Sequence, residues 1–134
     1  MKLISLCSVF IAFLLLSTSF KKAPTLKGSW RFCGGYFNGK LSAAPKDYVL
    51  QRNYTNATYE GFLLEKGEKP YKYEIGNYQL IADTCLETQT FSAQPSELIG
   101  ITLRFVYTMR HDTLVLKVKL PNGNIEEDHW KRVK

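Results

Sequence analysis

The amino-acid sequence predicts an all-β protein that folds as an eight-stranded, up-and-down antiparallel β-barrel. Three observations support this prediction. Helical periodicity is nearly absent after residue 20, apolar and polar residues alternate along successive segments, and turn-forming residues interrupt these segments about every ten positions. The connections are short, which favours a meander, and a meander of eight strands closes most simply into a barrel.

The N-terminal residues have the composition of a secretory signal peptide. Lys2 is an early charge, an unbroken apolar run covers residues 9–16, and the small residues Ser17 and Ser19 follow it. This run is too short to cross about 30 Å of hydrocarbon, so we expect cleavage after Ser19, with an uncleaved anchor as the alternative. The predicted organisation is a signal peptide at 1–19 and a barrel domain at 20–134, exported to the periplasm or the cell exterior.

Composition restricts the partners of this domain. The chain of 134 residues has a formal net charge of +6, but its Lys and Arg residues alternate with apolar residues as on solvated strand faces. We therefore expect no nucleic-acid partner. Cys33 and Cys85 follow the predicted signal, and an oxidising compartment would permit a disulfide. Because we place them on strands that are not neighbours, we expect no bridge between them.

Each predicted strand is a run of alternating or β-branched residues between turn signals. The eight strands cover residues 27–37, 46–54, 57–65, 70–81, 84–92, 98–109, 112–120 and 124–133. The segments "NGKLSAAP" and "SAQPSE" are read as loops. The pair Gly34-Gly35 predicts a bend or bulge within the first strand.

Two turns near the C-terminus predict the register of the last three strands. A two-residue loop at 111–112 pairs Met109 with Leu114 and Tyr107 with Leu116, so that both apolar faces point to the same core.

Residues 121–123, Pro-Asn-Gly, suit a type I turn followed by a left-handed residue. With this three-residue loop, one set of alternate side chains on the last strand points inward: Glu126, Asp128, Trp130 and Arg132. A two-residue loop would instead bury Glu127, His129 and Lys131 and expose the tryptophan, so we prefer the first register.

The two ends of the barrel domain are predicted to meet. Trp30 begins the first strand, and Trp130 and Arg132 end the last, which is its neighbour in a closed barrel. Gly28 lets the backbone turn tightly, Trp30 plugs the barrel floor, and Arg132 lies across the indole face. These four residues would seal one end of the barrel and leave the other end open.

The residues "GSW" near the start, eight strands, and an arginine within "DHWKR" at the close resemble the lipocalin-like (calycin) barrels. The closest resemblance is to small secreted bacterial members, and it covers roughly residues 26–133. It implies that Gly28, Trp30 and Arg132 seal the barrel. The chain departs from the family pattern in lacking a Thr-Asp-Tyr-type motif and in carrying Asp128 where Glu is common.

An apolar lumen is the predicted ligand site. The candidate ligand-binding residues are Leu103, Phe105, Tyr107, Met109, Leu116 and Tyr78. Such a wall with a few tyrosine hydroxyls suits a small apolar or amphipathic molecule. The predicted function is that of a secreted, non-enzymatic binding protein without a cofactor. The alternative is a filled barrel that binds a protein or an envelope component through its outer surface and loops, including Lys117, Lys119, Arg104 and Arg110.

Catalytic and metal sites are not expected. Glu126 and Asp128 share a face and could act as acid and base, but Arg132 is the expected partner of Asp128. Glu127 and His129 could hold a metal, but the preferred register points both outward, and no third ligand stands at a suitable spacing.

Overall fold

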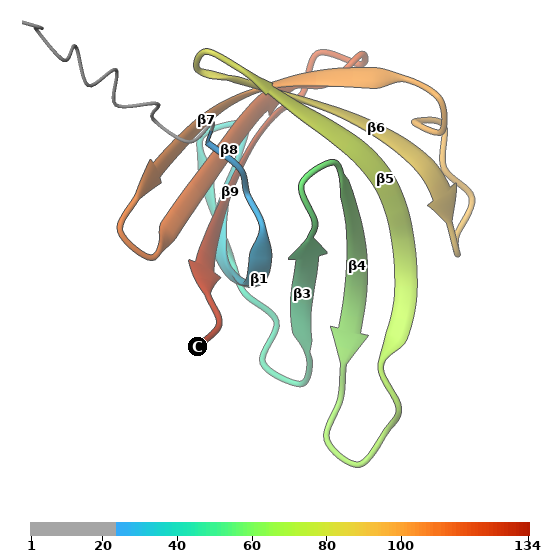
Figure 1. Cartoon of the computed structure of the whole chain (residues 1–134). Coiled ribbons are helices and arrows are strands. Elements are labelled where there is room, and N and C mark those ends of the chain that lie inside the picture. The colour runs from blue at the N-terminus through green and yellow to red at the C-terminus, as the bar shows by residue number, and fades with distance from the viewer. Residues whose placement is uncertain (1–23) are drawn as a thin grey trace, which may run out of the picture.

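Nine β-strands form one antiparallel sheet in the computed structural model, which describes residues 24–134 (Figure 1). The strands are β1 (Gly28–Phe37), β2 (Lys40–Ala43), β3 (Val49–Tyr54), β4 (Thr58–Leu64), β5 (Tyr71–Ile81), β6 (Thr84–Ser92), β7 (Thr102–Arg110), β8 (Thr113–Lys119) and β9 (Ile125–Arg132). The predicted signal peptide lies outside the described residues. No helix in the described part has the length and apolar character needed to span a membrane.

The sheet closes because β1 pairs with both β3 and β9. Neighbouring strands follow chain order from β3 to β9, and β9 returns to β1. The eight strands β1 and β3–β9 therefore make a closed up-and-down barrel, which confirms the predicted fold class. β2 pairs with the second half of β1 and lies outside this closed set.

The strand boundaries agree with the prediction to within one residue except at three places, the first of which is β3, which begins at Val49 and not at 46. The segment read as the loop "NGKLSAAP" contains β2, which follows a two-residue turn in which both Asn38 and Gly39 have positive φ. The predicted strand 98–109 begins only at Thr102, because the chain turns at Gly100, whose φ is +79°.

A bulge bends β1 at the predicted position. The pairing of β1 with β9 shifts register between Phe32 and Gly35, and Gly34 has a φ of +98°. A Cβ atom on Gly35 would collide with the backbone carbonyl of Glu127. The glycine pair thus allows β1 to change direction while it stays paired with β9.

The predicted registers at the C-terminus are confirmed. Met109 pairs with Leu114 and Tyr107 with Leu116. Across the next turn, the amide of Gly123 donates to the carbonyl of Leu120, as a three-residue loop requires. The resulting pairs are Leu114 with Trp130, Leu116 with Asp128, and Val118 with Glu126.

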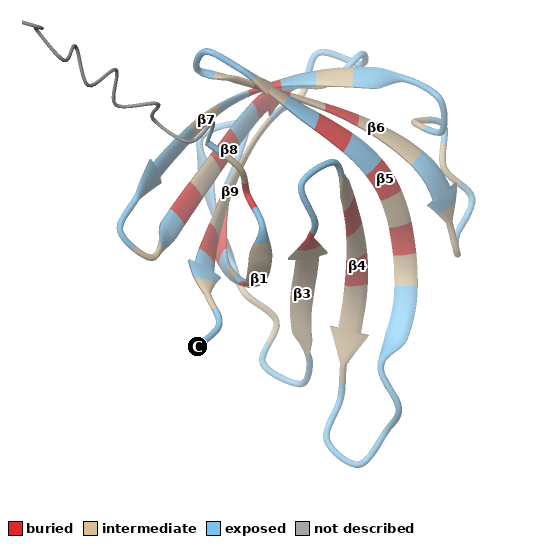
Figure 2. Ribbon diagram, in the orientation of Figure 1, coloured by how far each residue is buried: buried red, intermediate tan, exposed pale blue. Residues whose placement is uncertain are grey.

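The core lies inside the barrel, toward the end where β1 begins and β9 ends. Buried residues recur as separate bands along β4, β5 and β8 (Figure 2), as expected for strands that alternate between lumen and solvent. The buried apolar residues are Leu26, Trp30, Tyr54, Tyr59, Tyr78, Cys85, Phe105, Leu114, Leu116, Val118 and Trp130. Cys33 is exposed and Cys85 is buried, and both are free thiols.

Candidate functional site

The closed end of the barrel is sealed by a tryptophan and an arginine. Trp30 is fully buried, and the guanidinium carbon of Arg132 lies 4.2 Å from the centre of its ring. The indole Nε1 of Trp30 donates to the carbonyl of Leu26 at 2.8 Å, and Nη1 of Arg132 donates to the carbonyl of Lys27 at 3.2 Å. The segment before β1 is thereby fastened across the barrel floor.

Gly28 makes this stack possible. Its φ is +131°, and a Cβ atom there would lie 2.7 Å from Nη1 of Arg132. Trp130 lies deeper in the barrel, where its ring packs 5.3 Å from that of Phe32, and its Nε1 has no hydrogen-bond partner. The structure therefore brings Gly28, Trp30 and Arg132 together at the floor and places Trp130 above them.

The lumen above the floor contains a charged network that the sequence analysis did not predict. Arg52 on β3 contacts Oε1 of Glu74 on β5 through Nε at 2.9 Å and Nη2 at 2.8 Å. Its Nη1 contacts Oε2 of Glu87 on β6 at 3.1 Å and donates to the Tyr54 hydroxyl at 3.0 Å. Only 12 % of the Arg52 side chain is exposed, so this is a buried ion network.

Aromatic rings and amides complete the surroundings of the network. The guanidinium carbon of Arg52 lies 4.7 Å from the ring centre of Tyr59 and 5.2 Å from that of Trp130. Gln89 donates to Oε2 of Glu74 at 3.2 Å. These contacts hold the planar guanidinium between rings and carboxylates, an arrangement that suits arginine and not lysine.

Burial governs the electrostatics of these groups. Burial disfavours the charge on Arg52, but Glu74, Tyr54 and Glu87 hold the pKa of its guanidinium well above the ordinary value. Burial raises the pKa of Glu87, and Arg52 partly offsets this. The lumen therefore contains a buried ion network in addition to the predicted apolar wall and the inward residues of the last strand.

Strand alternation places the charged residues inside. Arg52 shares a face with Tyr54, Glu74 with Tyr78, and Glu87 with Cys85. In each pair the second residue belongs to the buried core. The alternation of inward and outward residues along a strand could therefore have predicted that Arg52, Glu74 and Glu87 point inward. Of these six residues, only Tyr78 had been predicted to line the lumen.

A cavity of about 180 Å³ lies above the network, toward the open end. Its polar wall contains Arg52, Glu74, Glu87, Gln89, Glu126 and Asp128, and its apolar wall contains Leu98, Leu103, Phe105, Ile101 and Leu120, with Tyr59. A second hollow of about 360 Å³ shares Leu98, Ile101 and Leu120 with it. These three residues thus form an apolar lip between the lumen cavity and the outer hollow.

The predicted ligand-binding residues do not all lie at the lumen cavity. Leu103 and Phe105 line the lumen cavity. Leu116 is part of the buried core, and the hydroxyl of Tyr107 donates to the carbonyl of Ala82 at 3.1 Å. Met109 is 38 % exposed near the closed end of the barrel.

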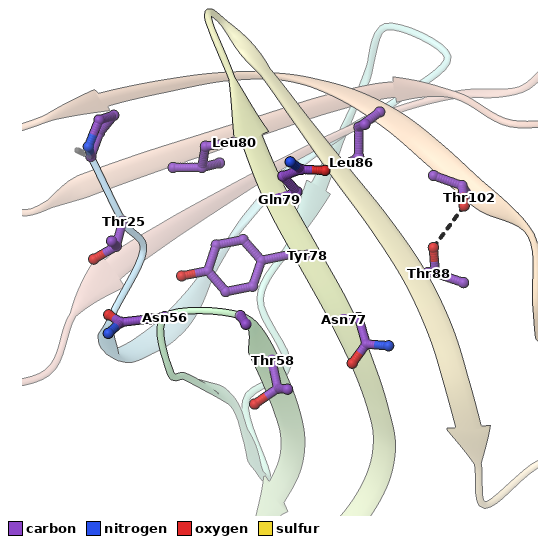
Figure 3. Close-up of a pocket in the computed structure, with 12 residues that line it drawn as sticks. Thr25, Asn56, Thr58, Asn77, Tyr78, Gln79, Leu80, Leu86, Thr88 and Thr102 are labelled. Atoms are coloured by element: carbon purple, nitrogen blue, oxygen red, sulfur yellow. Dashed lines mark hydrogen bonds between the residues drawn. The ribbon is translucent and has the colours of Figure 1, made fainter.

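Tyr78 lines a groove of about 750 Å³ near the closed end (Figure 3). Its ring points from β5 toward Thr25 and Asn56. Its hydroxyl donates to the carbonyl of Thr55 at 2.6 Å and accepts from the amide of Leu26 at 3.2 Å. Tyr78 thereby ties the first described residues to the β3–β4 turn. The groove walls are rich in Thr, Asn and Gln, and the charged network does not reach them.

Two expectations about ionisable pairs have different outcomes. Arg132 is not the partner of Asp128: it lies over Trp30, and Asp128 faces the lumen cavity. Burial raises the pKa of Asp128 to about 6, although Arg52 partly lowers it. His129 and Glu127 occupy the opposite face of β9, as expected, with Nε2 2.7 Å from Oε1.

The chain was compared with known proteins and families. Neither a protein-family model nor a curated protein matches it. The closed eight-stranded antiparallel barrel is consistent with the lipocalin-like resemblance but is not specific to it.

Proposed function

We propose that this protein is an exported, non-enzymatic binding protein that holds one small amphipathic molecule at the open end of a lipocalin-like barrel. The observation that carries this proposal is that a charged network and apolar side chains converge on one cavity inside the closed sheet. A concave site with a few convergent polar groups and an apolar wall is typical of small-molecule binding. The signal-like N-terminal sequence supports export.

The size of the cavity determines which part of a ligand enters it. Its volume of about 180 Å³ lies below the roughly 300–1,000 Å³ of pockets that enclose drug-sized ligands. A cavity of roughly 150 Å³ nevertheless accommodates benzene. We therefore place the polar end of the ligand in the lumen and its apolar part across the lip, in the hollow beside Pro121.

A second candidate function is a protein contact through the outer surface. Among the described strands, β2 pairs with β1 alone, so its other edge is unpaired. Leu41 on β2 is 76 % exposed, and its register partner Tyr36 is 43 % exposed. An exposed edge strand with apolar side chains favours addition of a strand from a partner protein.

Native mass spectrometry of the protein purified from its own host tests the first proposal. We expect a retained small molecule, which should be lost in Leu103→Trp because the larger ring fills the lumen cavity. The matched control is Val106→Trp on the same strand, where the side chain is 53 % exposed. The control should retain the molecule, and both variants should give the circular dichroism of the wild type.

Retention that survives Leu103→Trp would overturn the proposal that the lumen is the site. If capture of a protein partner is instead lost in Leu41→Lys, the second candidate is supported. The first candidate therefore predicts that Leu103→Trp abolishes binding, and the second predicts that Leu41→Lys does.

A further inference from the structure

The wall of the lumen cavity carries more negative than positive charge. Four carboxylates line it, Glu74, Glu87, Glu126 and Asp128, together with Arg52. Arg52 contacts both Glu74 and Glu87, so its charge is already matched by two acids. The cavity therefore presents unbalanced carboxylates to whatever enters it.

Glu126 and Asp128 are the carboxylates without a counter-ion. Within residues 24–134, neither forms an ion pair with a Lys, Arg or His side chain. The sheet neighbours of Asp128 are Gly35 on β1 and Leu116 on β8, which carry no charge. Arg52 is near enough to lower the pKa of Asp128, but no cation among residues 24–134 forms a direct ion pair with it.

The apolar lip lies beside these carboxylates. Leu98, Ile101 and Leu120 belong both to the lumen cavity and to the outer hollow, and Ile101 is 41 % exposed. Apolar surface gains free energy when a ligand removes it from water. A ligand that satisfies both features carries positive charge at one end and an apolar body at the other.

We infer, on the basis of the function proposed above, that the ligand is a protonated amine whose ammonium group lies against Asp128 and Glu126 and whose apolar part covers Leu98, Ile101 and Leu120. An ammonium group donates charge-assisted hydrogen bonds to carboxylates, which are stronger than bonds between neutral groups. A partly dry cavity strengthens that attraction.

Two other ligand classes fit less well. An anion would have only Arg52 to attract it, and Arg52 is occupied by Glu74 and Glu87. A metal ion usually needs several ligands held together, and no group of three or more His, Cys, Asp or Glu residues suited to a metal occurs among the described residues. A metal ion would also leave the apolar lip uncovered.

Isothermal titration calorimetry with matched ligands tests this inference. The probes are hexylamine, hexanol and hexanoate, and a second series of 2-phenylethylamine, 2-phenylethanol and phenylacetate, all at pH 8. We expect each amine to bind at least about tenfold more tightly than its alcohol, the scale of one charge-assisted hydrogen bond. The carboxylates should bind most weakly.

Variants locate the charge contact. Asp128→Asn and Glu126→Gln together should lower amine affinity by about tenfold or more and lower alcohol affinity much less, because the amides still accept a hydrogen bond from a hydroxyl but carry no charge. The matched control is Glu127→Gln, because Glu127 lies on the same strand and its side chain faces His129 on the outside. This control should not change amine affinity.

The pH dependence gives an independent readout. The charged and titratable groups around Asp128 are Arg52, Glu74, Glu126 and His129, and burial raises the pKa of Asp128 to about 6. The Asp128 carboxylate is ionised above that pH, so amine affinity should be full at pH 8 and several-fold lower at pH 5. Asp128→Asn should remove most of this dependence.

The outcomes separate this inference from the proposed function. Alcohols or carboxylates that bind as tightly as amines, and lose binding in Leu103→Trp, would overturn the amine inference while the lumen remains a binding site. Calcium ions that displace the amines would overturn it in favour of a metal. If no probe binds and no molecule is retained from the host, both the inference and the proposed function fail.

Discussion

Two arginines lie over aromatic rings in this barrel, and their surroundings differ. Arg132 covers Trp30 at the closed end, and its hydrogen bond goes to the backbone carbonyl of Lys27. Arg52 lies over Tyr59 in the lumen, where it also contacts two buried carboxylates. The first arginine closes the barrel, whereas the second makes the interior charged.

The comparison shows that similar contacts can carry different energetic consequences. An arginine over an indole contributes about 0.5–2 kcal/mol, and its removal leaves an apolar ring that still packs. A buried arginine between carboxylates contributes little net stability, but its removal leaves charges buried without a partner. Loss of Arg52 should therefore be much more damaging than loss of Arg132.

The largest expected effect is that of Arg52→Met. It leaves Glu74 and Glu87 in the lumen without their cation, so the free energy of unfolding should fall by about 3–5 kcal/mol. Urea denaturation followed by tryptophan fluorescence measures this change. Replacing all three residues by apolar ones should restore much of the loss, because no unpaired charge then remains.

If Arg52→Met lost less than about 1 kcal/mol, as an exposed pair does, the network would not be buried in the way described.

Gly28→Ala should have an intermediate effect at the closed end. Its φ of +131° disfavours alanine, and the new Cβ atom would lie 2.7 Å from Nη1 of Arg132. We expect a loss of about 1–3 kcal/mol in the free energy of unfolding. Gly39→Ala is the matched control, because Gly39 has a φ of +79° and no atom within 4 Å of the added Cβ.

Equal losses in the two glycine variants would mean that backbone strain alone explains the effect and that the Arg132 stack does not need the space.

The smallest effect is expected for Arg132→Met. Methionine keeps part of the apolar cover over Trp30 and removes the charge, so the loss should be about 0.5–2 kcal/mol. The same urea experiment measures it, with Arg132→Lys retaining a weaker cation–π contact. A loss as large as that of Arg52→Met would contradict the distinction drawn between the two arginines.

Local patterns predicted much of the fold and the floor of the barrel. Alternation and turn chemistry placed Met109 opposite Leu114, and the Pro-Asn-Gly turn placed Asp128 and Trp130 inward. The strand β2 was missed although Asn-Gly is a strong hairpin signal, because only four paired residues follow the turn. The small residues and the proline of this segment had instead suggested a loop.

The candidate site was predicted only in part. Leu103 and Phe105 were recognised because they belong to a clear apolar alternation, and both line the cavity. Arg52, Glu74 and Glu87 also stand at inward positions, but single charges on three separate strands have no common spacing. Arg52 lies 22 residues from Glu74 and 35 residues from Glu87 along the chain.

The all-β class, the order of the eight barrel strands, the register of the last hairpins and the stack of Arg132 on Trp30 could be predicted from the amino-acid sequence. They depend on local periodicity, on turns and on the meeting of the first and last strands. The ion network of Arg52 with Glu74 and Glu87, and the separation of Asp128 from Arg132, are seen only in the folded barrel. The physical reason is that the β1 bulge and the closure of the barrel determine which inward side chains meet across it.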